Sequence, residues 1–295
     1  MGEKTDLKDC CACCPETTCI NLFIHDKKDS ESIGGELYLY KRLNHSWIKN
    51  ENLEKHVCAN GRLLDCACSI VEAAHEQQKE DYLTKICIEI LRDMKASLYL
   101  ALSGHYRQAI LIQRCVFENF LYGLYFHAEL YSFSKNDDDK TQVHGNFMSW
   151  INGGFPKSDA YLRDIIERGG IIGKAENKEW GTLFNQLSKF VHTIRHTPTG
   201  ESITCGKAEP CGCEAVLEFD KNNLIEWSEY YQKLFFLILY ELLILYPSIK
   251  KDKDVKQALQ DIRTEFKGIK GELNNHYLDE LLKMRGGKSN IEMKQ

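Results

Sequence analysis

Proline is scarce in this sequence, and no apolar run is long enough to span a membrane. The 295 residues include only 5 prolines, so little in the chain interrupts long helices. The longest apolar run, from Leu234 to Tyr246, holds 13 residues and contains Glu241. A membrane-spanning helix needs about 20 apolar residues. The opening residues 1–6 carry mixed charge and no apolar run follows, so we expect no secretion signal, no membrane association and a cytoplasmic protein.

Several sequence motifs of common enzyme classes are also missing. The chain has no Gly-rich phosphate loop of the Walker type and no dinucleotide-binding fingerprint. It has no His-Glu-x-x-His metal motif and no Gly-x-Ser-x-Gly nucleophile turn. The formal net charge is −5, which argues against a surface that binds nucleic acid over its whole area.

What the chain does contain is helical periodicity. Within residues 81–102, apolar side chains recur at spacings of three and four: Leu83, Ile86, Ile90, Met94 and Leu98. Similar patterns run through residues 36–195 and 222–284, whereas the aspartate-rich segment 134–140 is typical of a surface loop. The sequence therefore predicts an all-α bundle of six to eight helices.

Three short runs depart from this periodicity and predict a small β appendage to the bundle. Residues 19–25 resemble one strand, and residues 202–205 and 214–219 resemble a hairpin joined by a Gly-bounded loop. We expect three parts: a Cys-rich segment, residues 1–35, packing on the 202–219 hairpin; a helical bundle, residues 36–247; and charged C-terminal helices with a tail, residues 248–295.

Eight of the 13 cysteines gather near these predicted strands. In a chain without a secretion signal they are expected to be free thiols or metal ligands. If the strands form one sheet, Cys10, Cys13, Cys211 and Cys213 could supply the four thiolates of a structural zinc site. Three further cysteines are alternative ligands: Cys11, Cys14 and Cys205. Reduced thiols without metal, or redox sensing, are the other interpretations.

Five more cysteines fall within predicted helices, where small, buried thiols are common. We expect them to be core residues: Cys58, Cys66, Cys68, Cys87 and Cys115.

Two polar pairs interrupt apolar helical stretches. Arg114 and Glu118 stand four residues apart, as do Ser188 and His192, so each pair shares one helix face. Glu241 is isolated in its apolar run and needs a partner, because an unpaired buried charge is costly. We predict that these five residues converge in one polar cluster. The cluster would be either a buried ion-pair network or a cleft in which Arg114 binds an anion and His192 exchanges protons.

These motifs also carry a family resemblance. The stretch 104–133 with Arg-x-x-x-Glu at its middle, then Leu-Ser-Lys-Phe-Val-His at 187–192 and the apolar helix at 224–246, resembles the HEPN-like helical families. More narrowly, it is similar to a bacterial branch found beside defence and toxin–antitoxin genes. The resemblance implies an all-helical bundle that often dimerises, with RNA cleavage in the catalytic members. Those members carry an arginine, four to six residues and then a histidine, a spacing found at no histidine here.

Two hypotheses of function follow. The first is a non-catalytic interaction or sensor module of a bacterial anti-phage or toxin–antitoxin system, with a protein partner. The second is a divergent, metal-independent ribonuclease or nucleotide-directed enzyme that uses Arg114, Glu118 and His192, with RNA as a partner. The resemblance and the aromatic residues of 117–133 favour a homo-oligomer in either case.

Overall fold

A computed structural model describes residues 47–49, 53–191, 220–266 and 276–283, and within these ranges the chain is predominantly helical with no strand. The predicted all-α class is confirmed for this part of the chain. The strands predicted at 19–25, 202–205 and 214–219 lie outside the described residues. None of the described helices combines the length and apolarity needed to cross a membrane.

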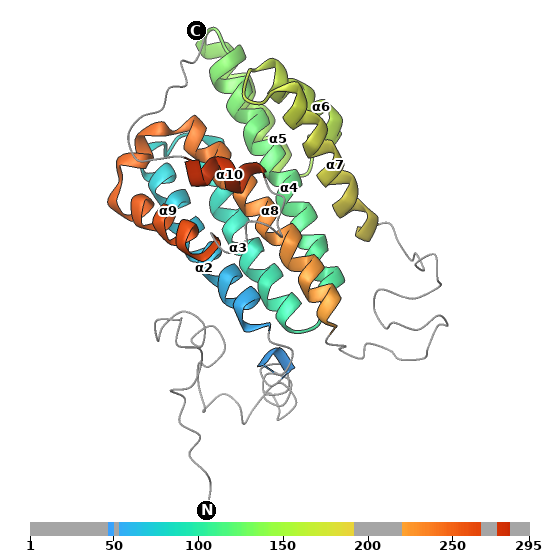
Figure 1. The fold of residues 1–295 in the computed structure, drawn as a ribbon. Coiled ribbons are helices and arrows are strands. Elements are labelled where there is room, and N and C mark those ends of the chain that lie inside the picture. The colour runs from blue at the N-terminus through green and yellow to red at the C-terminus, as the bar shows by residue number, and fades with distance from the viewer. Residues whose placement is uncertain (1–46, 50–52, 192–219, 267–275, 284–295) are drawn as a thin grey trace, which may run out of the picture.

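Four long helices form the body of the bundle: α2 (Glu54–Gln77), α3 (Tyr82–Leu102), α4 (Tyr106–Ala128) and α8 (Lys221–Leu245). Helix α8 packs against α2, α3 and α4 (Figure 1). Helices α3 and α4 form the closest pair, where a Cβ added at Gly123 would lie 2.8 Å from Cδ1 of Leu83. Any larger residue at position 123 would therefore require the Leu83 side chain to shift.

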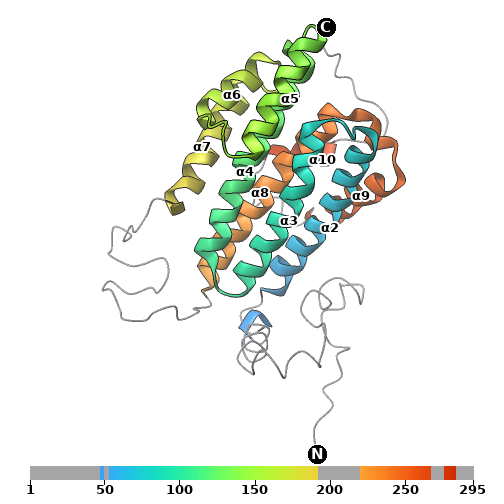
Figure 2. The same ribbon diagram turned by 180° about the vertical axis from the view of Figure 1, so that it is seen from behind.

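Shorter helices flank this body on two sides. Helices α5 (Asp137–Ile151), α6 (Asp159–Arg168) and α7 (Lys174–Val191) gather around α4. A 3₁₀ turn (Pro247–Lys251), α9 (Lys253–Phe266) and α10 (His276–Lys283) follow α8. Helix α9 lies on the opposite side of the bundle from α6 and α7, as the front and rear views both show (Figure 2).

Local sequence explains how the helices begin and end. Asp81 caps α3 by accepting a hydrogen bond from the backbone N–H of Leu83 at 2.9 Å. The same helix ends before Gly104, whose φ of 80° lies in the left-handed region that favours glycine. Gly170, with φ of 74°, plays the same part after α6. Both helices therefore end just before a glycine.

The segment after Phe133 differs from the prediction. Residues 134–140 were expected to be a surface loop, but α5 begins inside them at Asp137. Asn136 caps the helix by accepting from the backbone N–H of Asp139 at 2.9 Å. Three aspartates then occupy the first turn, where negative charge interacts favourably with the helix dipole. The acidic run therefore starts a helix.

Helix α4 ends in an irregular turn. After Ala128 it passes into a single π turn (Glu129–Phe133), in which the N–H of Ser134 bonds to the carbonyl of Glu129 at 3.0 Å. The extra residue in this turn changes the direction in which the side chains of 129–133 project. Tyr131 is thereby left 55% exposed at the edge of the bundle.

Candidate functional site

Arg114 joins α4 to α7. Its Nη1 lies 2.9 Å from Oε2 of Glu118, one turn further along α4, and its Nε donates to Oγ of Ser188 on α7 at 3.2 Å. The guanidinium also lies over the ring of Phe184, 4.9 Å from its centroid. The structure therefore brings together Arg114, Glu118 and Ser188 as the sequence spacing predicts.

This junction is not buried. The side chains of Arg114 and Glu118 keep 20% and 35% of their surface exposed. An ion pair that water can reach has a small desolvation penalty and contributes little to stability. The alternative of a closed, buried ion-pair network therefore does not describe these two residues. His192, the fourth member of the predicted cluster, lies outside the described residues.

Glu241 does not join the Arg114 junction. It is 1% exposed, and neither carboxyl oxygen has a hydrogen-bond partner in the described part of the chain. Burial, followed by the nearby Glu176, raises the pKa of Glu241 well above its ordinary value. Glu176 precedes Ser188 by 12 residues on α7, about 18 Å along the helix. The expected pairing with Arg114 is absent because Glu241 faces the other end of α7.

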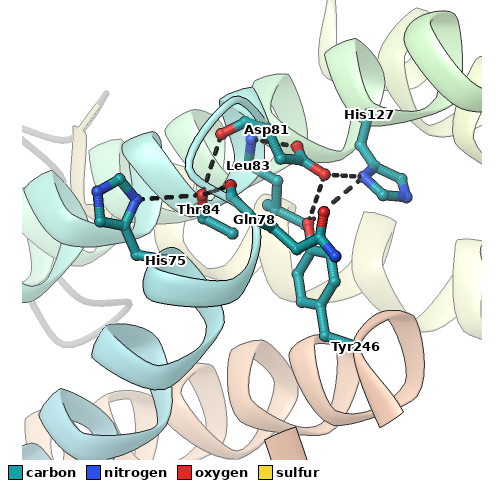
Figure 3. Close-up of polar contacts among 7 residues, drawn as sticks. All are labelled: His75, Gln78, Asp81, Leu83, Thr84, His127 and Tyr246. Carbon is teal, nitrogen blue, oxygen red and sulfur yellow. Dashed lines mark hydrogen bonds and ion pairs between the residues drawn. The ribbon is translucent and has the colours of Figure 1, made fainter. Parts of the chain in front are cut away.

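A second polar cluster forms around Asp81, and the sequence did not indicate it (Figure 3). Oδ2 of this carboxylate accepts hydrogen bonds from Nδ1 of His127 and from the hydroxyl of Tyr246, each at 2.7 Å. Because Asp81 also accepts from the backbone N–H of Leu83, its side chain receives three hydrogen bonds. Its side chain is 1% exposed and that of His127 is 13% exposed. A buried carboxylate requires donors of this kind.

The turn before α3 is tied to the same cluster. The Thr84 hydroxyl donates to the carbonyl oxygens of Gln78 and Asp81 at 2.9 and 3.0 Å, and it lies 3.3 Å from Nδ1 of His75. The Tyr131 ring, on the π turn, lies 4.7 Å from the His127 ring. Asp81 and Tyr246 are 165 positions apart, so no local spacing in the sequence could have paired them. The only local signal was an aspartate in the cap position before a helix.

The described cysteines are mostly core residues, as predicted, with one exception. Cys58, Cys66 and Cys87 are buried and Cys68 is half-buried, but Cys115 is exposed. Burial raises the pKa of the Cys66 thiol to about 12. Among the described residues, no three histidine, cysteine or acidic side chains gather as metal ligands do. The predicted zinc ligands, from Cys10 to Cys14 and Cys205 to Cys213, lie outside these ranges.

The described residues thus define an all-α bundle with two polar junctions, one at Arg114 and one at Asp81. No protein-family model, curated protein or solved structure matches this chain. A function is therefore argued from the geometry of these junctions and from the resemblance of the sequence.

Proposed function

We propose that this protein is a non-catalytic helical interaction or sensor module of a bacterial defence system of the anti-phage or toxin–antitoxin kind. One observation supports the non-catalytic part. Arg114 contacts Glu118, Ser188 and the Phe184 ring, which makes it a connection between α4 and α7. The defence context rests on the resemblance to HEPN-like families.

An incubation with labelled RNA and nucleotides tests the non-catalytic part. We expect purified wild-type protein to leave both intact. Cleavage by the wild type that disappears in the His192→Ala and Arg114→Ala variants would refute the proposal. The matched control is Arg92→Ala, which removes another arginine of a same-helix ion pair on the surface of α3.

Phage challenge tests the defence context. Cells expressing the chain with its neighbouring genes should plate phage less efficiently than cells lacking the chain. Glu118→Gln, which removes the charge that holds Arg114, should weaken that protection if the junction positions a partner surface. Equal plating with and without the chain, across a panel of unrelated phages, would count against the defence role.

A divergent ribonuclease or nucleotide-directed enzyme is the second candidate, with Arg114, Glu118 and His192 in the roles given above. The partial exposure of the ion pair favours it, because a guanidinium that solvent reaches can exchange Glu118 for a phosphate, a group that arginine can bind through two nitrogens. RNA is the polymer that this candidate would act on. The labelled-RNA experiment separates the two candidates directly.

A homo-oligomer is proposed on the resemblance alone. The aromatic run of 117–133, which favoured it in the sequence, is mostly covered by the chain's own helices, since Phe117, Phe120 and Phe126 are fully buried. Light scattering at micromolar concentration should give a multiple of the 34.1 kDa chain mass. A species of 34.1 kDa alone would remove this part of the proposal.

A structural zinc ion on Cys10, Cys13, Cys211 and Cys213 also remains a proposal. Protein purified without chelator should contain about one zinc per chain, as a single four-thiolate site requires. Serine substitution of Cys211 and Cys213 should abolish the binding, whereas substitution of the exposed Cys115 should not. Metal-free protein whose thermal stability is unchanged by chelators would leave the cysteines as thiols.

A further inference from the structure

His127 presents one ring nitrogen to Asp81 and the other away from it. A carboxylate has no hydrogen to donate, so in the 2.7 Å contact with Oδ2 of Asp81 the hydrogen belongs to Nδ1 of His127. In the neutral imidazole, Nε2 then carries the lone pair. This atom points away from Asp81 in Figure 3, and it is not among the buried atoms that lack a partner. His127 is only partly buried, with 13% of its side chain exposed.

The carboxylate behind the ring is fixed in place. Asp81 is held by the N–H of Leu83, by His127 and by the Tyr246 hydroxyl, which belong to three different helical segments or their ends. A histidine oriented by a buried carboxylate, with its far nitrogen free, is the arrangement that prepares an imidazole as a base or nucleophile. The negative charge of Asp81 would offset positive charge developing on the ring.

The exposed ring of Tyr131 lies beside the imidazole ring of His127. Tyr131 is 55% exposed, and its ring centroid is 4.7 Å from that of His127 at an interplanar angle of 47°. The π turn that carries Tyr131 is a type of irregularity frequent at functional sites. An exposed aromatic face next to a free imidazole nitrogen can receive a flat ring of a substrate by stacking.

From this geometry we propose that His127, Asp81 and Tyr131 form an acyl-transfer centre that acts on aryl esters. Nε2 of His127 attacks the ester carbonyl carbon, and a C–N bond forms. The bond from that carbon to the aryl oxygen breaks, and the aryl oxide leaves with the electron pair. The ring, which keeps its Nδ1 hydrogen, is now an acyl-imidazolium. The oxygen of a water bonds to the acyl carbon and the C–N bond breaks, which gives the carboxylic acid; the remaining proton passes to solvent and Nε2 regains its lone pair. Asp81 is a positioning residue, and Tyr131 binds the aryl ring.

The centre is independent of the Arg114 junction, so it can be tested without reference to the proposed function. The probe is 4-nitrophenyl acetate, followed by release of 4-nitrophenolate from full-length protein. The protein-dependent rate should fall about a hundredfold in His127→Gln and on the order of tenfold in Asp81→Asn. Tyr131→Leu should raise KM while leaving kcat nearly unchanged. The matched control is His144→Gln, an exposed histidine whose Nδ1 lies 3.0 Å from the Tyr82 hydroxyl.

A second measurement on the wild type avoids any folding defect of the variants. Diethyl pyrocarbonate transfers an ethoxycarbonyl group to histidine nitrogens, and peptide mass spectrometry assigns the modified positions. His127 should be modified faster than the more exposed His144, although its side chain is only 13% exposed. Modification of His144 first, or equal 4-nitrophenolate release by wild type and His127→Gln, would overturn the proposal.

Discussion

Arg114 and Ser188 are 74 positions apart in the chain, and Nε of Arg114 donates a hydrogen bond to Oγ of Ser188 at 3.2 Å. This bond fixes the register of α7 against α4. Glu118 holds the same guanidinium from its own helix at 2.9 Å. The junction therefore combines one contact within a helix and one between helices.

The exposure of this junction predicts a small effect on stability. Glu118→Ala should lower the free energy of unfolding by about 1 kcal/mol or less, because water solvates Arg114 once its partner is gone. Urea denaturation measures the change. Glu89→Ala is the matched control, since Glu89 pairs with Arg92 in an even more exposed ion pair. A loss of about 3 kcal/mol or more would mean that Arg114 is left as an uncompensated buried charge.

Substitution of Asp81 should lower the free energy of unfolding much more. Asp81→Ala removes the cap of α3 and leaves His127 and Tyr246 without their acceptor, so we expect a loss of about 3 kcal/mol. Tyr246→Phe removes a single hydroxyl and should cost only about 1 kcal/mol. Thermal or urea unfolding of both variants checks the ranking. Equal losses would contradict the view that Asp81 is the shared acceptor.

The sequence predicted those parts of the structure that depend on local spacing. The three-and-four periodicity located α3, and the spacing of four predicted the contact between Arg114 and Glu118. The meeting of Arg114 with Ser188 was predicted from their polar character, but most contacts between distant segments were not predictable, because two helices can pack in several registers. Asp81 and Tyr246 meet only when α8 packs beside the start of α3.

Glu241 is a second residue whose partner could not be predicted from the sequence. Its position in an apolar run correctly indicated burial, but the sequence could not say which end of α7 it would face. The prediction assumed that a buried carboxyl must be ionised and paired. A buried carboxyl can instead keep its proton, which removes the need for Arg114 as a partner.

Thiol reactivity should follow the burial of the described cysteines. Cys115 is exposed and should react with iodoacetamide in the native protein. Cys66 and Cys87 should react only after unfolding, because they are buried and burial raises the pKa of each thiol. Mass spectrometry of peptides, before and after denaturation, assigns each site. Rapid native labelling of Cys87 would contradict the packing of α3 against its neighbours.

The buried carboxyl of Glu241 gives the stability of the fold a specific dependence on pH. Burial raises the pKa of this carboxyl in the folded state, whereas the unfolded chain has the ordinary value near 4.5. Between that value and the higher pKa of the folded state, the unfolded chain releases the proton and the folded chain retains it. This group therefore stabilises the fold fully at low pH and contributes less and less as the pH rises, by about 1.4 kcal/mol per pH unit. The decline ends once the pH passes the folded-state pKa.

Substitution isolates this contribution. Glu241→Gln cannot ionise, so its free energy of unfolding should fall less steeply than that of the wild type between pH 5.5 and 8.5, with the largest difference at the alkaline end. Glu229→Gln, an exposed position on the same helix, should keep the wild-type slope. Urea denaturation across this range measures both. Parallel curves for wild type and Glu241→Gln would show that Glu241 ionises in the folded protein, and a partner for its charge would then have to lie within reach of α8.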